Sequence, residues 1–354
     1  MKLIVFIATM AAAAALFAQT KPQAKGTVQR IKVHGKSLEG NLEGDSPDRD
    51  VTIYLPPGYD RNRNQRYPVV YLLHGYLLTD QYWTGTGVSL PGISTPGANV
   101  PAAMDNLIAS GAAKPMIVVM PNAYTIYAGS FYSNSVTTGD WETYIAEDLV
   151  GYIDSHYRTI ADRLSRGLAG HSMGGYGTIR IGMKRPDVFS SLYTMSACCL
   201  INNAPPGTPA NAKQGTAKGN DTKGGGGGLQ QNFAVAAAFS PNPKNPPRYL
   251  DERIKDGHEQ PLVVAKWHAA SPLAMIDQYV TNLKKYHAIT MDVGLQDQYG
   301  LADQNIQLGQ MMADFGIMST LETYEGDHMN KIPERVETKL LPFFSKSLAS
   351  KKGR

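Results

Sequence analysis

One short stretch contains the residue types that a nucleophilic serine needs. Residues 170–175 read GHSMGG, a G-x-S-x-G pattern that contains Ser172 and is followed by one more glycine. An apolar run precedes the pattern, and a segment with helical character, 176–185, follows it. A strand that turns directly into a helix leaves no room for bulky neighbours and exposes the serine hydroxyl. A helix starting there also directs free N–H groups and the positive end of its dipole at the hydroxyl. We therefore predict that Ser172 is a nucleophile and not part of a structural turn.

A serine hydroxyl is a weak nucleophile at neutral pH, so Ser172 needs a general base and an acid that orients this base. Of the eight histidines, His328 follows the last predicted strand in a loop from which it can reach Ser172. Asp297 lies in the loop after the preceding predicted strand. The sequence thus predicts a Ser172, Asp297 and His328 triad. Asp292 and Asp303 are the alternatives for the acid.

Developing negative charge on the substrate oxygen requires two backbone N–H donors, and losing one such donor typically costs about 3 kcal/mol. The amide of Met173, directly after the nucleophile, is the first candidate. The amide of Tyr76, directly after the sequence LLHG at 72–75, is the second. The chain contains neither an H-E-x-x-H motif nor a phosphate-binding loop, so we expect no metal and no cofactor.

The elements that position these residues follow from the hydrophobic pattern. Continuous apolar runs at 67–73 and 115–120 are typical of strands covered on both faces. Alternating runs at 26–34 and 51–55 predict antiparallel edge strands at the N-terminal side of the sheet. Further strands are predicted at 191–197, 289–293 and 319–324, and helices at 100–110, 141–157, 176–185, 301–315 and 333–348. This order predicts an α/β fold with a mostly parallel central sheet and helices on both faces.

The N-terminus has the pattern of a secretory signal peptide. Lys2 is followed by an apolar, alanine-rich run, and a small residue, Ala18, precedes Gln19. The run is shorter than the roughly 20 residues that span a bilayer, so we favour cleavage over an uncleaved anchor. We expect a signal peptide at 1–18, a single domain at 19–354, and a secreted or periplasmic protein.

Composition limits the classes of partner. The formal net charge is only +4, which predicts neither a nucleic-acid partner nor strong attraction to a membrane. The two cysteines, Cys198 and Cys199, are adjacent, and this favours two buried thiols over a strained vicinal disulfide.

One long stretch interrupts the alternation of strands and helices. Residues 202–251 are rich in glycine and proline, and only 233–239 has the character of a short apolar helix. Such a stretch inside a compact domain is usually functional or disordered. A lid over the substrate and a surface insertion remain equal alternatives.

Five motifs together resemble one family. They are YLLHG at 71–75, GDWETYI at 139–145, YRT at 157–159, RGLAGHSMGG at 166–175 and PDVF at 186–189. The chain resembles the putative esterase family, which includes S-formylglutathione hydrolases, feruloyl and acetylxylan esterases, enterochelin esterases and the mycolyltransferase antigens. The resemblance spans roughly 51–348 and implies the α/β-hydrolase fold. It also implies an acid in a Gly-x-x-Asp loop, matching Asp297, a base after a Gly-Asp pair, matching His328, and an oxyanion amide matching Tyr76.

The resemblance implies serine-dependent hydrolysis of carboxylic esters through an acyl-enzyme, with acyl transfer as the family's minority chemistry. Export and the long insertion fit feruloyl or acetyl esters of polysaccharide better than a glutathione thioester. A non-catalytic exported binding protein on the same scaffold is a third alternative. Candidate substrate-binding side chains are the aromatic residues Trp83, Tyr127, Phe131, Tyr132 and Trp141, together with His171 beside the nucleophile. The oligomeric state stays open.

Overall fold

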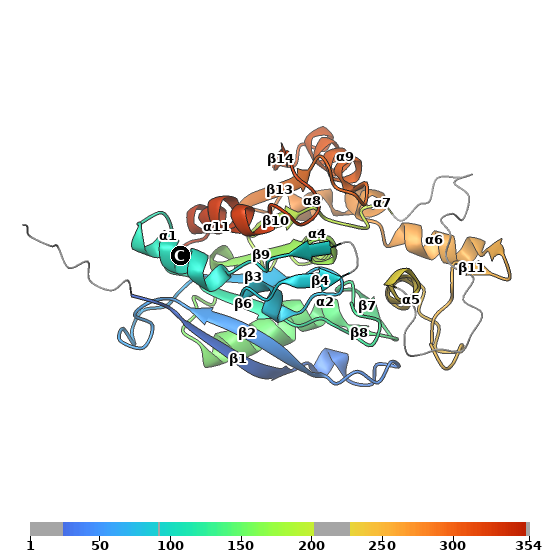
Figure 1. The fold of residues 1–354 in the computed structure, drawn as a ribbon, viewed down its shortest axis with the longest axis horizontal. Coiled ribbons are helices and arrows are strands. Elements are labelled where there is room, and N and C mark those ends of the chain that lie inside the picture. Colours follow the sequence, from blue (N-terminus) through green and yellow to red (C-terminus); the bar gives the residue numbers. More distant parts are fainter. Residues whose placement is uncertain (1–23, 91–92, 202–226, 352–354) are drawn as a thin grey trace, which may run out of the picture.

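A central sheet of eight strands organises the molecule (Figure 1). The computed structural model describes residues 24–90, 93–201 and 227–351, so the expected signal peptide and residues 202–226 lie outside the described residues. In spatial order the strands are β1 (Thr27–His34), β2 (Asp48–Leu55), β6 (Ile117–Pro121), β3 (Val69–Leu73), β9 (Arg166–His171), β10 (Ser191–Met195), β13 (Ala288–Gly294) and β14 (Thr320–Tyr324). The pairs β1–β2 and β2–β6 are antiparallel, and all later pairs are parallel. The expected α/β-hydrolase-like sheet, with its antiparallel N-terminal strands, is confirmed.

Helices cover both faces of the sheet. One face carries the run α2 (Trp141–Thr143), η3 (Tyr144–Asp148) and α3 (Leu149–His156), with α4 (Met173–Lys184) and α9 (Leu301–Asp314). The other carries α1 (Val100–Ala109), α10 (Ile332–Arg335), η6 (Val336–Leu340) and α11 (Leu341–Ser347). Within β3, Val69, Tyr71 and Leu73 pack toward the first face and Val70 and Leu72 toward the second. This two-sided burial explains the continuous apolar runs, because a strand covered on both faces has no solvent side.

The predicted long elements are present, with ends shifted by a few residues. The segments expected at 141–157 and 333–348 each contain one π-helical turn, at Tyr144–Asp148 and Val336–Leu340. Short elements were not predicted: the 3-10 turn η2 (Asp80–Trp83) and the hairpins β4–β5 (Val88–Leu90, Ile93–Thr95) and β7–β8 (Asn134–Ser135, Gly139–Asp140). Two or three residues per strand are too few for a periodic pattern.

The described part of the insertion, 227–251, and the segment that follows it form structure of their own. Helix α5 (Gly227–Phe239), the hairpin β11–β12 (Ile254–Lys255, His258–Glu259) and α6 (Pro261–Ala269) lie beyond one end of the sheet, at the right of Figure 1. The short segments α7 (Pro272–Met275), η5 (Ile276–Tyr279) and α8 (Val280–Leu283) lead back to β13. Helix α5 is longer than the expected 233–239.

Hydrogen bonds fasten this region to the sheet domain. The Ser135 hydroxyl donates to the Ala237 carbonyl (2.6 Å), and the Thr137 hydroxyl to the Tyr249 carbonyl (2.5 Å). The two bonds join the insertion at Ala237 and at Tyr249 to residues of the β7–β8 hairpin region. Within the described residues, no helix is long and apolar enough to cross a membrane.

Candidate active site

Ser172 occupies a strained turn between β9 and α4. Its backbone has φ 56° and ψ −115°, a region that residues with a side chain rarely adopt. The amide of Ser172 donates to the Met195 carbonyl (2.9 Å), which ties the turn to β10. A Cβ on Gly170 would lie 2.3 Å from the backbone of Gly174. The turn can close only because glycine stands at these positions, and the strain is of the kind that functional sites retain.

Asp297 and His328 meet at the carboxyl edge of the sheet. Their loops follow β13 and β14, and His328 Nδ1 lies 2.7 Å from Asp297 Oδ2. The Asp297 side chain is fully buried and His328 is 5% exposed. The two loops can approach because of Gly294, where a Cβ would lie 2.3 Å from the Gly326 carbonyl oxygen. A buried carboxylate at Nδ1 holds the imidazole proton there, so Nε2 is left as the basic nitrogen.

Further contacts orient both partners. The amide of Tyr299 donates to Asp297 Oδ1 (2.9 Å), and the amide of His328 donates to Oε1 of Gln298 (3.1 Å). Gln298 and Tyr299 were not predicted from the sequence, although their places beside Asp297 could have suggested a supporting role.

His171 connects the elbow to the His328 loop. Its Nε2 lies 2.9 Å from the His328 carbonyl oxygen, and the centroids of the His171 and His328 rings are 4.6 Å apart. Burial, with the His328 ring nearby, lowers the pKa of His171 well below its ordinary value, so this neutral ring donates from Nε2. His171 is 1% exposed. The expected contact with substrate is therefore replaced by a positioning role. No hydrogen bond joins the Ser172 hydroxyl to the His328 imidazole, both of which the structure describes; such bonds often tighten only when substrate binds.

The loop after β3 lies against the nucleophile. A Cβ on Gly75 would be 3.4 Å from the Ser172 Cβ. Neither the Tyr76 amide nor the Met173 amide donates to any group in the described part of the chain, so both are available to an oxyanion.

His74 supports this loop from behind. Nδ1 donates to the Gly75 carbonyl (2.8 Å), and Nε2 accepts from the amide of Ala123 (2.8 Å). Burial lowers the pKa of His74 to about 4, so the ring stays neutral and can do both. The sequence predicts an oxyanion amide directly after LLHG at 72–75 and no role for His74, because that role depends on Ala123, far along the chain.

Aromatic rings gather between the elbow helix and α5. Phe131 is stacked on Tyr76 (6.1 Å between centroids) and lies edge-on to Tyr176 (6.4 Å) and Phe239 (5.5 Å). Tyr127 contacts Phe233 of the same helix (5.9 Å). The described part of the insertion thus reaches the surroundings of Tyr76 and of the first turn of α4.

Besides His171, four of the expected substrate-binding residues are buried. Trp83, Phe131, Tyr132 and Trp141 are at most 1% exposed. The indole of Trp141 donates to the Thr138 carbonyl (2.8 Å), and the Tyr132 hydroxyl donates to the His74 carbonyl (3.1 Å). Their roles in this structure are in packing and loop support, because the rings are enclosed by protein.

Asp292, the alternative acid, has a different partner. It lies inside β13, where Oδ2 accepts from Nε of Arg335 (2.6 Å) and from the Tyr193 hydroxyl (2.7 Å). Burial raises the pKa of Asp292 to about 6, and Arg335 acts against that rise. Asp327, next to His328 in sequence, accepts from the amides of Met329 and Asn330 in its own turn.

Both cysteines are free thiols at the end of β10. Their Sγ atoms are 2.9 Å apart, and the amide of Cys198 donates to the Ser172 carbonyl (3.2 Å). Burial raises the pKa of the Cys198 thiol well above its ordinary value, and Cys199 adds to this. The expected free thiols are thus present, and each residue is partly buried.

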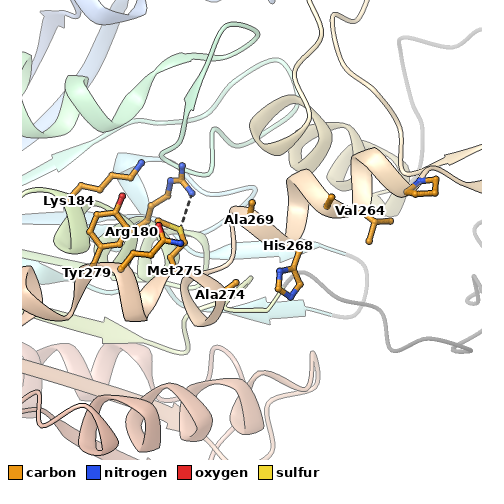
Figure 2. A pocket seen from close by; sticks show the side chains of 11 residues that line it. Arg180, Lys184, Val264, His268, Ala269, Ala274, Met275 and Tyr279 are labelled. Carbon is orange, nitrogen blue, oxygen red and sulfur yellow. Dashed lines mark hydrogen bonds between the residues drawn. The ribbon is translucent and has the colours of Figure 1, made fainter.

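A separate pocket of about 820 Å³ lies further along α4. Figure 2 shows Arg180 and Lys184 at one end of it and Val264 of α6 toward the other. The carboxylate of Glu142 accepts from both cations at 2.6 Å and offsets one of their two positive charges. Ser172, Asp297 and His328 do not line the pocket. No cluster of three or more histidine, cysteine or acidic residues in the described chain could hold a metal ion.

Comparison with known proteins adds a family to this geometry. The model of the "Putative esterase" family matches residues 46–331. An endo-1,4-beta-xylanase/feruloyl esterase of Xylanibacter ruminicola is 32% identical over 49% of this chain and 22% of its own length. An esterase of Mycobacterium tuberculosis is 31% identical over 40% of this chain and 27% of its own length. This chain therefore matches about a quarter or less of these curated relatives.

A solved ferulic acid esterase shares the fold, with a TM-score of 0.63 and 24% identity over 92% of this chain and 99% of that one. Since the family model covers most of the chain, including the elbow and the loops of Asp297 and His328, the protein belongs to the putative esterase family.

Proposed function

We propose that the protein hydrolyses carboxylic esters through an acyl-enzyme formed on Ser172. Ser172 Oγ attacks the ester carbonyl carbon while His328 Nε2 takes its proton, and the same proton then passes to the departing alkoxide. Water then attacks the acyl carbonyl carbon and gives a proton to His328. His328 returns this proton to Ser172 Oγ as the bond between Oγ and the acyl carbon breaks and the carboxylic acid leaves. Asp297 holds the imidazole in the required tautomer, and the amides of Tyr76 and Met173 stabilise the oxyanion.

The observation that carries the proposal is the 2.7 Å contact between the buried Asp297 carboxylate and His328, in loops that contact the strained elbow. Three features position His328: the fully buried carboxylate of Asp297, the close approach of the two loops at Gly294, and the hydrogen bond from His171 to the His328 carbonyl. A histidine on the surface would need none of them. Perturbed and strained groups concentrate at functional sites.

For the substrate, we propose esters of polysaccharide, with feruloyl esters first and acetyl esters second. Two observations support this choice. The chain is similar to proteins named feruloyl and ferulic acid esterase. The partly exposed ring of Tyr76, in the oxyanion loop and stacked on the buried ring of Phe131, also favours a flat acyl group.

We also propose that the mature protein is exported after cleavage behind Ala18. The support is the charged start, the short apolar run and the small residue at the cleavage point. N-terminal sequencing of the protein recovered from the periplasm or medium tests this directly. A chain that begins at Met1 in the membrane fraction would contradict it.

The test of the mechanism combines fluorophosphonate labelling with hydrolysis of acetyl, butyryl and feruloyl esters. We expect labelling at Ser172 alone. Ser172→Ala should lower kcat by roughly 10⁴-fold or more and leave the melting temperature nearly unchanged. Ser110→Ala, at an exposed serine after α1, is the matched control and should label and turn over normally.

Retained activity in Ser172→Ala would contradict the mechanism. Absence of both labelling and turnover in the unmodified protein would instead favour a binding protein. Transesterified product that forms faster than free acid, when an alcohol is added, would indicate acyl transfer.

A further inference from the structure

Tyr299 is an exposed aromatic ring placed directly against His328. Its centroid lies 4.9 Å from that of the imidazole, and the two rings are almost perpendicular, at 87°. Although its neighbour is nearly buried, Tyr299 is 54% exposed. A tyrosine ring with one face accessible beside a reactive group can pack against a ligand bound there.

The turn that carries Tyr299 is well defined. Its amide donates to Asp297 Oδ1 (2.9 Å), and the amide of Gly300 donates to the Asp297 carbonyl (3.0 Å). Gly300 has φ 68°, which allows the chain to enter α9 at once. The ring is therefore presented by a turn built around the buried carboxylate, and little ordering of the backbone is needed to bind a ligand there.

The chemistry of the proposed reaction indicates which part of the substrate meets this ring. His328 must donate a proton to the leaving alkoxide, so the alcohol half of the ester has to lie beside the imidazole. In the same reaction the acyl carbonyl oxygen is bound by the amides of Tyr76 and Met173 and not by His328. An exposed ring at His328 thus contacts the alcohol, not the acyl group.

The surroundings of Tyr299 favour a neutral, hydroxyl-rich alcohol. Leu295, in the same loop, is 46% exposed, and the exposed side chain of Gln298, whose Oε1 accepts from the amide of His328, offers its NH2 group as a hydrogen-bond donor. The carboxylates of Glu325 and Asp327 belong to the adjoining loop and disfavour an anionic leaving group. A sugar ring has an apolar C–H face that can lie on an aromatic ring and hydroxyls that can accept from this NH2 group.

We propose that Tyr299 is a specificity-determining residue that stacks against the sugar ring of the leaving alcohol. This inference rests on the proposed esterase function, and it assigns the alcohol side of the same site. The contact requires the aromatic face and not the phenolic hydroxyl.

The test compares two esters of ferulic acid that differ only in the alcohol: the methyl ester and a pentose ester. Tyr299→Ala should lower kcat/KM for the pentose ester about tenfold, mainly through KM, and change it less than twofold for the methyl ester. Tenfold corresponds to about 1.4 kcal/mol, within the range for aromatic contacts. Tyr299→Phe should behave like the unmodified protein. Tyr152→Ala, at a partly exposed tyrosine of α3, is the control that should leave both esters unaffected.

An equal fall for both esters would overturn the inference, because the ring would then act only on His328. Unchanged kinetics for both esters would overturn it too. A second measurement does not need turnover: saturation-transfer NMR of methyl xyloside with Ser172→Ala and with the Ser172→Ala, Tyr299→Ala double variant. Saturation-transfer signals of the sugar that are present with Ser172→Ala and absent with the double variant support stacking of the sugar on Tyr299. Equal signals with both variants contradict it. Retained hydrolysis by Ser172→Ala, in contrast, would contradict the proposed function and not the stacking on Tyr299.

Discussion

Two buried aspartates near the end of β13 have partners of opposite kinds. Asp292, within the strand, is paired with Arg335, a permanent cation, and with the Tyr193 hydroxyl. Asp297, in the following loop, is paired with His328, a group that can accept and release a proton. Both carboxylates are enclosed by protein, so burial alone does not distinguish a structural aspartate from one that serves chemistry. The partner distinguishes the two aspartates. An arginine only neutralises the charge of the carboxylate, whereas an imidazole that the carboxylate stabilises can take up and release a proton.

The largest expected effect separates the two aspartates by activity. Asp297→Asn should lower kcat by about 10⁴-fold, because an amide cannot hold the proton on Nδ1 of His328 or stabilise the imidazolium. Ester hydrolysis at pH 7 to 8 measures this, with circular dichroism to show that the fold is retained. Asp292→Asn is the matched variant. A comparable loss of kcat per folded molecule in Asp292→Asn would break the comparison.

The next effect separates the pairs by stability. Arg335→Met should reduce the free energy of unfolding by about 3–5 kcal/mol, because it leaves the Asp292 carboxylate buried without its cation. The folded-state pKa of Asp292 is raised to about 6 even with Arg335 present, so protonation relieves the penalty. An acidic group whose pKa is higher in the folded than in the unfolded state lowers the free energy of unfolding as the pH increases. Urea unfolding should therefore show a larger difference between Arg335→Met and the unmodified protein at pH 8 than at pH 5. A loss independent of pH would show that packing of Arg335 matters more than its charge.

A third carboxylate, Glu43, extends the comparison to a buried acid without a partner. Neither of its oxygens has a hydrogen-bond partner among the described residues. Burial, with the carboxylate of Asp45 nearby, raises the pKa of Glu43 to about 10. The side chain is then protonated in the folded protein at neutral pH but ionised in the unfolded chain, so its contribution to stability decreases as pH rises from about 4.5 toward 10.

Glu43→Gln should accordingly raise the free energy of unfolding at pH 8 by roughly 1–3 kcal/mol and have little effect at pH 4. Thermal unfolding across this pH range measures the difference. The variant Glu39→Gln, at an exposed position of the same segment, should change stability much less. Destabilisation of Glu43→Gln at pH 8 would mean that Glu43 is charged and paired in solution.

Much of the fold could be predicted because its signals are local and repeated. The apolar runs of β3 and β6 and the helical spacing in 141–157 each specify an element without reference to the rest of the chain. The extent of α5 and the hairpins around it could not be predicted, since short strands and a low-complexity segment carry no period. Their arrangement depends on contacts with β7 and with residues such as Thr137.

The site divides in the same way. Ser172, Asp297 and His328 stand out by residue type and by their places after predicted strands. The roles of His74 and His171 do not, because each depends on a partner that only folding brings near: the amide of Ala123 and the carbonyl of His328.

By itself, the sequence determined the order of strands and helices, the elbow around Ser172, and the loops that carry Asp297 and His328. The tertiary structure decided which side chains remain accessible there. Trp83 and Trp141 are enclosed while Tyr299 is exposed, although all three are aromatic. The physical reason is that hydrophobicity is a property of a residue, whereas burial is a property of everything packed around it.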